Sequence, residues 1–310
     1  MGRGDLTNAE WARLESLLPL GGVRGGRWSD HRRVINGVLY RARTGVRWRD
    51  LPERFGPWET AYKRHRRWSA DGTWKMLLSR IQATEDAVGG IDWDVSVDST
   101  AVRAHQHAAG ARKAPTAPVA QKGTGSGTDL VDPVLRKLAV RLEAVVRSAN
   151  ACGRSRGGFT TKIHLVADGR CRPLAFVLTP GHYGDGPQLE HVLEQISVPR
   201  PGVGRPRTRP DRVLADKAYT SRSNRRYLGR RGIRHTIPER LDQQRHRQNR
   251  GSQGGRPTGF DREHYKKRNT VERAINRLKG FRAVATRYEK RAYIYLGTVA
   301  LAALMIWLRT

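Results

Sequence analysis

A basic segment in the last fifth of the chain combines the residue types that phosphate chemistry uses. Tyr265, Arg268 and Glu272 lie within the run HYKKRNTVERAINRLKGF, and Lys279 follows about two helical turns beyond Glu272. Arg268, Glu272 and Lys279 are spaced i, i+4 and i+11, so in a helix they project from one face. The spacing predicts a carboxylate flanked by cations that contact phosphates. The alternative is a solvated basic helix in which Glu272 only pairs with Arg268.

Two further carboxylates follow short apolar runs. Asp98 comes at the end of DWDVSVD and Asp216 at the end of RVLAD, and each run is interpreted as a strand that stops at its aspartate. Carboxylates on separate elements can hold two divalent cations roughly 3.5 to 4 Å apart, which activate water or a 3′ hydroxyl and stabilise the attacking and leaving oxygens. Each aspartate alone is more simply a turn cap. Together with Glu272, the set favours a metal site for phosphodiester cleavage or transfer.

The order of the elements explains how these groups can meet. Beyond about Gly90 the pattern predicts the strand DWDVSVDST, a hairpin of TKIHLVAD and PLAFVLTP turning at Asp168-Gly169, a helix capped by Asp185, the strand RVLADKAY, a helix over 221–231, the strand IRHTIP and the Glu272 helix. This is the α/β order of a ribonuclease H-like mixed sheet. In that order the first and fourth strands are neighbours, so Asp98 and Asp216 are expected at adjacent strand ends.

Residues 1–90 are predicted to form an N-terminal all-α domain, and residues 91–310 the catalytic domain. Helices are expected from 6 to 19, capped by Thr7, and from about 29 to 43, followed by a glycine turn and two short helices around Gly56-Pro57. This pattern is typical of a helix-turn-helix-like DNA-binding module. Its last helix carries the cations Lys63, Arg64, Arg66 and Arg67, whereas Trp58, Tyr62 and Trp68 are expected in its core.

Composition favours a polyanionic partner. The chain has 310 residues and a formal net charge of +31, from 59 Lys and Arg against 28 Asp and Glu. Phosphates neutralised by Lys or Arg release condensed counterions, so double-stranded DNA is the expected partner and an anionic membrane surface is the rival. The apolar run 292–308 is short and isolated, so a buried helix is a better interpretation than a membrane span. Two cysteines and no apolar N-terminal run favour a reducing cytoplasm.

Other residues carry weaker predictions. Ser155 and Arg156, in the run GRSRGG, are candidates for phosphate contacts because the glycines allow DNA to approach closely. The run His105-Gln106-His107 could bind a transition metal, although contact with DNA is the simpler interpretation. Asp92, Asp94 and Asp168 are expected in turns.

The chain resembles the bacterial transposases of the insertion sequence 5 family, which carry a DDE catalytic triad. The blocks that carry the resemblance span nearly the whole chain and include LTNAEWARLESLLP, RWRDLPERFGPWETAYKRHRRW, VDSTAVRAHQHAAGA, LADKAYTS and YKKRNTVERAINRLKGF. The resemblance implies that Asp98, Asp216 and Glu272 bind the metal, and that Tyr265, Arg268, Glu272 and Lys279 form the Tyr-Arg-Glu-Lys group. It also implies a Mg²⁺-dependent reaction, with Mn²⁺ as a substitute. Hydrolysis frees a 3′ hydroxyl at the end of the element, and that hydroxyl attacks target DNA.

The resemblance further implies that the N-terminal module binds terminal inverted repeats and that a homodimer acts on DNA at the bacterial nucleoid, without a membrane. One departure is an insert at about 114–152, which begins as a linker and continues as a helix with an apolar stripe from Val134 to Val146. Two alternatives stay open. One is a decayed or domesticated DNA-binding protein without catalysis, and the other is a ribonuclease H-like nuclease that cuts but does not join.

Overall fold

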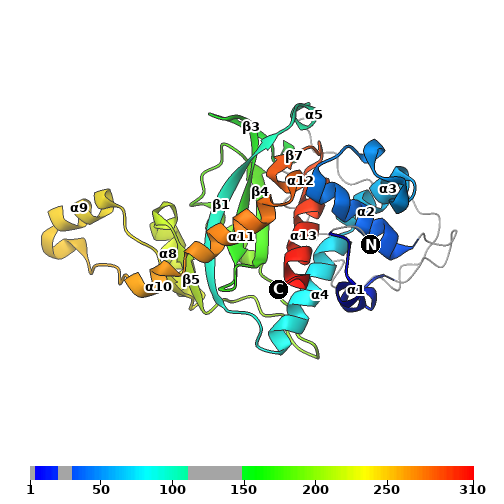
Figure 1. Cartoon of the computed structure of the whole chain (residues 1–310). Helices are drawn as coiled ribbons and strands as arrows, with labels where there is room; N and C mark the ends of the chain where they lie inside the picture. The colour runs from blue at the N-terminus through cyan, green and yellow to red at the C-terminus, as the bar shows by residue number, and fades with distance from the viewer. Residues whose placement is uncertain (1–3, 20–29, 111–148) are drawn as a thin grey trace, which may run out of the picture.

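The computed structural model describes residues 4–19, 30–110 and 149–310, and a mixed β-sheet lies at its centre (Figure 1). β1 (Asp94–Ala104) is antiparallel to β3 (Gly158–Ala167) and parallel to β5 (Arg212–Ala215), and β5 is parallel to β6 (Arg234–Thr236). The prediction that the first and fourth strands of the sequence pattern lie side by side is therefore confirmed by the pairing of β1 with β5. The sheet order is β2 (Gly153–Ser155), β3, β1, β5 and β6, with β4 (Pro173–Pro180) on β3 and β7 (Thr286–Arg287) on β1.

Strand β1 continues past Asp98, so the prediction that it stops at this aspartate is wrong. Its pairing with β5 ends at Val97, which lies opposite Ala215. Its pairing with β3 continues as far as Arg103, because the antiparallel partner is long enough to satisfy the backbone of the second half of β1. Asp98 therefore lies where β5 leaves the sheet, and the end of β5 rather than the end of β1 opens this position.

Helices cover both the sheet and its edge. α11 (Asn269–Lys279) packs on β1 and β3 and buries an apolar face made of Val271, Ala274, Ile275 and Leu278. α10 (Arg262–Lys266) precedes it, α7 (Gln188–Glu194) packs on β3 and β4, and α8 (Arg222–Arg230) packs beside β6. α9 (Leu241–Asn249) has no buried residue and extends away from the body of the protein (Figure 1).

The N-terminal region is helical, as predicted. α1 (Asn8–Glu15) begins with the expected capping box between Thr7 and Glu10, and α2 (His31–Thr44) ends at Gly45, whose φ of 72° is left-handed. Two short 3₁₀ turns separate α2 from α3 (Trp58–Ala70). The predicted glycine turn is therefore the one at Gly45. A second one follows α3, where Gly72 with a φ of 82° precedes α4 (Thr73–Ala87), a helix that is not among the predicted elements.

Helix α13 (Ala292–Leu308) joins the N-terminal helices to the sheet, and the prediction of a buried helix here is confirmed because every residue of it is buried. It packs against α3, α4 and β4. Gly297 allows the close crossing with α3, since a Cβ there would lie 2.0 Å from Ser69 Oγ. Within the described ranges, none of the helices is long and apolar enough to cross a membrane. One apolar core thus extends from the sheet into α3 and α4.

Two predictions about chain organisation stay predictions. The boundary at residue 90 falls between α4 and β1, but α13 contacts elements on both sides of it. The helix expected over 132–146 within the insert lies outside the described residues.

Candidate active site

The two strand aspartates project from one face of the sheet at neighbouring positions. Val97 pairs with Ala215 in parallel register, and Asp98 and Asp216 are the next residues along the two strands. Side chains alternate along a strand, and register partners point to the same side, so both carboxylates lie on the face that also carries Ser96. The hydroxyl of Ser96 accepts a hydrogen bond of 2.9 Å from Thr270 Oγ1 of α11. The carboxylates therefore face α11.

Arg268 connects the strand carboxylate to the helix carboxylate. It immediately precedes α11, and its guanidinium donates to Asp98 Oδ2 at 3.2 Å and also to Glu272 Oε1. The ring of Tyr265 lies beside the same guanidinium, with its centroid 6.0 Å from Arg268 Cζ. The structure thus gathers the three predicted acids, Tyr265 and Arg268 in one place. Glu272 is held beside the other acids by its ion pair with Arg268. Its side chain is 47% exposed, against 26% for the side chain of Asp98.

Burial dominates the electrostatics of Asp98. It raises the pKa of this carboxyl above the ordinary value, the N–H of Ser99 and the guanidinium of Arg268 oppose the shift, and the charge of Asp216 adds to it. Burial likewise raises the pKa of the Tyr265 hydroxyl. The ionised form of Asp98 is therefore disfavoured in this site, and Arg268 supplies part of the positive charge that opposes this.

A fourth acid, Asp185, supports the site from the opposite face of β1. Ser99 points away from α11 by strand alternation, and its hydroxyl donates to Asp185 Oδ1 at 2.7 Å. Lys162 Nζ donates to the same oxygen at 2.9 Å. Burial disfavours the ionised form, but the hydrogen bonds from Lys162 and Ser99 outweigh it, so the pKa of Asp185 lies below its ordinary value. The prediction that Asp185 caps a helix is wrong, because α7 begins only at Gln188 and has Pro187 at its N-cap.

Tyr219 lies buried among these acids. It belongs to the 3₁₀ turn Lys217–Tyr219, which Asp216 caps by accepting the N–H of residue 218 at 2.8 Å. The Tyr219 side chain is 1% exposed, and its hydroxyl has no hydrogen-bond partner within the described residues. Burial and then the charges of Asp185, Asp98 and Asp216 raise its pKa. The hydroxyl is thus a donor held close to the carboxylates.

Sequence reasoning missed both Asp185 and Tyr219 as members of the site. A usable signal was present for each. Asp185 follows the strand PLAFVLTP after a short loop, much as Asp98 and Asp216 follow apolar runs, and Tyr219 belongs to the block LADKAYTS that contains Asp216.

The remaining predicted contacts lie away from the acids. Lys279 is at the far end of α11, about 10 Å beyond Glu272 at 1.5 Å per residue. Ser155 lies on edge strand β2, where its hydroxyl donates to Gly158 O at 3.2 Å and accepts from Thr160, and Arg156 follows it in the turn. On α3, Lys63, Arg66 and Arg67 are exposed, whereas Arg64 is half-buried over the ring of Trp68.

The donor set suits a divalent cation in its chemistry. Asp98, Asp216 and Glu272 offer hard carboxylate oxygens, which Mg²⁺ and Mn²⁺ prefer. Across residues 4–19, 30–110 and 149–310, no group of three His, Cys, Asp or Glu side chains is close enough to hold a metal ion. Glu272 instead pairs with Arg268, and His105 and His107, with rings 4.7 Å apart, have no third ligand among these residues. Glu272 has to turn away from Arg268 to complete a metal site.

Comparison with known proteins places this chain in a family. The family model described as "Transposase DDE domain" matches residues 90–307, well over half of the chain. The chain belongs to the DDE transposases. A second model, "Putative transposase of IS4/5 family", matches residues 6–78. No solved structure matches this transposase.

Curated proteins similar to this chain include two that are named as transposases. An uncharacterised protein of Sinorhizobium fredii is 40% identical over 111 residues, which are 35% of this chain and 84% of the relative. A "Putative transposase for insertion sequence element IS6501" of Brucella ovis is 35% identical over 150 residues, 48% of this chain and 99% of that protein. A "Putative transposase for insertion sequence element IS402" of Burkholderia cepacia is 32% identical over 190 residues, 60% of this chain and 82% of the relative.

These matches confirm the resemblance to insertion-sequence transposases and the ribonuclease H-like α/β fold of the DDE domain. Enzymes with this domain typically use divalent metal ions. Neither the family models nor the relatives assign a role to individual residues.

Proposed function

We propose that this DDE transposase binds the terminal inverted repeats of an insertion sequence, cleaves the element ends and joins the freed 3′ hydroxyl to target DNA. The observation that carries the proposal is the placement of Asp98 and Asp216 side by side on the face covered by α11, with Arg268 and Glu272 beside them. These three acids would hold two Mg²⁺ ions, with Mn²⁺ as a substitute. Bound divalent cations lower the pKa of water and neutralise charge on the attacking and leaving oxygens.

The cations around the acids would bind DNA phosphates. Arg268 donates hydrogen bonds to Asp98 and Glu272. Once bound metal ions neutralise those carboxylates, its guanidinium would be free to contact a phosphate. Tyr265 stands beside it and would donate its hydroxyl to the same phosphate group. Lys279, one end of α11 away, would contact a more distant phosphate, as would Ser155 and Arg156 at the sheet edge.

The N-terminal helices would recognise the element ends. Lys63, Arg66 and Arg67 project from α3 into solvent, and Arg64 lies half-buried beside them. A homodimer would hold two element ends together, at the nucleoid in the cytoplasm. Pairing of two ends requires two active sites to be brought onto one target, which a dimer supplies.

The test uses labelled inverted-repeat ends, a target plasmid and Mg²⁺. We expect cleaved ends and joined products from the wild type, and neither from Asp216→Ala, with end binding unchanged within about twofold. Asp211→Ala is the matched control, because Asp211 is 52% exposed just before β5 and should retain both products. Cleavage without joining would identify a nuclease, and binding without cleavage under any divalent ion would identify a DNA-binding protein. Either result would overturn the proposal.

A further inference from the structure

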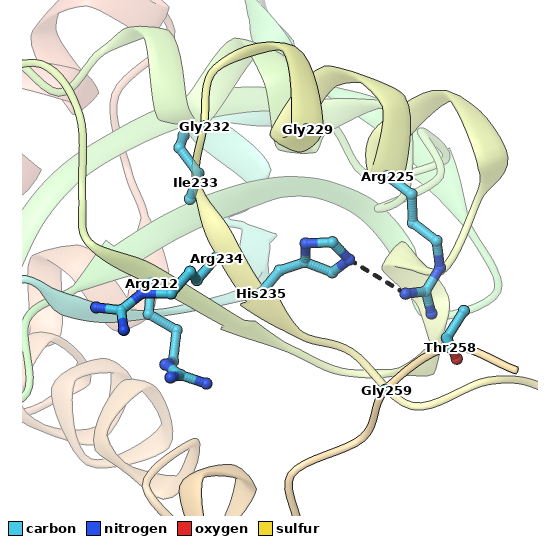
Figure 2. Close-up of a pocket in the computed structure, with 9 residues that line it drawn as sticks. All are labelled: Arg212, Arg225, Gly229, Gly232, Ile233, Arg234, His235, Thr258 and Gly259. Carbon is cyan, nitrogen blue, oxygen red and sulfur yellow. Dashed lines mark hydrogen bonds between the residues drawn. The ribbon is translucent and has the colours of Figure 1, made fainter.

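A basic groove lies at the β6 edge of the sheet, outside the carboxylate site (Figure 2). It has a volume of about 630 Å³, and no Asp or Glu is among the described residues that line it. β6 is the last strand in the sheet order, so its outer backbone edge has no strand partner in the described part of the chain. The side chains that matter most are Arg212 of β5, Arg234 and His235 of β6, and Arg225 of α8.

The charges in this groove are held in place by neutral groups. Arg225 donates to Thr220 Oγ1 at 2.7 Å and to Ile237 O at 3.0 Å. Its guanidinium also lies 3.3 Å from His235 Nε2, the contact drawn as a dashed line in Figure 2. Burial and then the charge of Arg225 lower the pKa of His235, so this ring is neutral at physiological pH. The charge of Glu239, which does not line the groove, favours the charged form of Arg225.

Of the other two arginines, Arg234 is the more available to an anion, because the Arg212 side chain is only 15% exposed. Arg234 is exposed and has no ion-pair partner within the described ranges. Arg212 donates to Thr236 Oγ1 at 3.3 Å, and its closest carboxylate oxygen, on Asp94, is 3.9 Å away. The Arg212 Nε is buried without a hydrogen-bond partner. Three guanidinium groups therefore line this groove. The described acids that act on them do not line it: Asp94 and Asp261 act on Arg212, and Glu239 acts on Arg225.

The side of the groove formed by Arg212 and Arg234 shares a sheet face with the two strand aspartates, whereas His235 and its partner Arg225 lie on the other side of β6 (Figure 2). Arg212 and Asp216 are four residues apart on the same chain segment, so strand alternation places them on one side. Arg212 and Arg234 are register partners across β5 and β6 and hence point to that same side. Four residues of strand span roughly 13 Å. Each DNA strand rises 3.4 Å per base pair, so this separation corresponds to about four base pairs.

We propose that this groove binds the DNA backbone about four base pairs from the phosphate that is cleaved. The proposal rests on the proposed function, because the distance is counted from the scissile phosphate. Guanidinium groups bind phosphate through paired, charge-assisted hydrogen bonds. Glycines leave room for the backbone to approach, since a Cβ at Gly229 or Gly259 would meet nothing within 4 Å. The DNA would then run from the carboxylates along β5 towards the β6 edge.

The experiment removes one charge from the protein and one from the DNA. The variant is Arg234→Ala, and the matched control is Arg230→Ala, an exposed arginine of α8 that does not line the groove. Inverted-repeat duplexes carry a single neutral methylphosphonate at each position from two to six base pairs from the cleavage site. Affinities are measured by fluorescence anisotropy with Ca²⁺ in place of Mg²⁺, at several salt concentrations.

We expect one methylphosphonate near the fourth base pair to weaken binding about tenfold for the wild type and for Arg230→Ala, since charged hydrogen bonds carry this magnitude. Arg234→Ala should bind unmodified DNA about tenfold more weakly and be indifferent to that one methylphosphonate. Its slope of log affinity against log salt should fall by about 0.9. Arg234→Lys should restore the slope, because it restores the charge.

Two results would overturn the inference. In the first, no phosphate position distinguishes the wild type from Arg234→Ala. In the second, the sensitive position lies outside the range of two to six base pairs. Thermal unfolding of the variants checks that the exposed substitutions leave the fold intact. Failure of the proposed function is seen separately, as a wild type that binds these ends but yields no cleaved or joined product in Mg²⁺.

Discussion

Replacement of Arg172 by methionine tests how the β3–β4 hairpin is fixed to the rest of the transposase. Arg172 is 1% exposed, and its guanidinium donates to Asp168 Oδ2 at 2.6 and 2.9 Å and to Gly90 O at 2.6 Å. Its Cζ lies 3.8 Å from the ring centroid of Trp307. One side chain therefore joins the hairpin turn to the segment entering β1 and to α13.

The expected loss follows from what the substitution leaves behind. Asp168, which is fully buried, would keep only the backbone N–H groups of residues 170 and 172 as partners. Removing one partner of a buried ion pair lowers the free energy of unfolding by about 3–5 kcal/mol, because a buried charge is left uncompensated. Methionine retains some packing against Trp307, so we expect a loss of about 3 kcal/mol at pH 7.5.

The loss should depend on pH in a defined direction. Burial raises the pKa of Asp168 above its ordinary value even with Arg172 present. Without the guanidinium the pKa rises further, so the folded variant takes up a proton at a higher pH than the wild type does. An acid with a raised pKa in the fold destabilises the protein above that pKa and ceases to do so below it. The difference between variant and wild type should therefore shrink as the pH falls from 7.5 to 5.

Urea unfolding followed by tryptophan fluorescence at both pH values measures these differences. Arg170→Met is the matched control, because Arg170 is exposed in the same turn and should stay within about 0.5 kcal/mol of the wild type. Adding Asp168→Asn to Arg172→Met should recover at least half of the loss, since it removes the buried charge. A loss no larger than that of Arg170→Met, or a double variant as unstable as the single one, would refute the reasoning.

Three further predictions concern the site and its surroundings. Tyr219→Phe removes the unpartnered hydroxyl while keeping the ring, so Mn²⁺ affinity measured by calorimetry should fall about tenfold, and an unchanged affinity would mean that the hydroxyl does not orient the carboxylates. Mg²⁺ at 100 times its dissociation constant should stabilise the wild type by about 2.7 kcal/mol in thermal unfolding, and Asp98→Asn should abolish this gain; a full gain in the variant would contradict the metal site. Burial lowers the pKa of His65 to about 3 and that of His164 to about 4, so each ring is neutral in the fold and binds a proton on unfolding. The free energy of unfolding should therefore be constant above about pH 7 and fall by roughly 2 kcal/mol from pH 6 to pH 5, and a flat profile would contradict this.

The position of the two strand aspartates could be predicted from the sequence because it depends on rules of order and alternation. Asp98 and Asp216 each follow an apolar run, and a mixed sheet of this order makes those runs neighbours. The pairing of Arg268 with Glu272 also follows from local helix spacing. The hydrogen bond from Arg268 to Asp98 does not, because it depends on how α11 crosses β1.

The roles of Asp185 and Asp168 could not be read from the sequence. An aspartate between glycines just before a helix can be a helix cap or a partner in an ion pair. Only the tertiary contacts with Ser99 and Lys162 show that Asp185 is an ion-pair partner. Asp168 does lie in the predicted hairpin turn, but its burial depends on Arg172. The continuation of β1 beyond Asp98 was hidden by the polar residues Ser99 and Thr100, which resemble a strand end unless the partner strand is known to be long.

The crossing of α13 with α3 constrains how this transposase could be recombined with a relative. A chimera that exchanges residues 1–90 would replace Ser69 and its neighbours but keep Gly297, although the two lie against each other without room for a side chain on α13. A relative with a larger residue at position 69 would clash with the backbone of α13, and one adapted to a bulkier α13 would leave a void. The N-terminal helices, which are proposed to bind the element ends, therefore have to be exchanged together with α13. Specificity should be changed by grafting exposed side chains of α3 rather than whole segments.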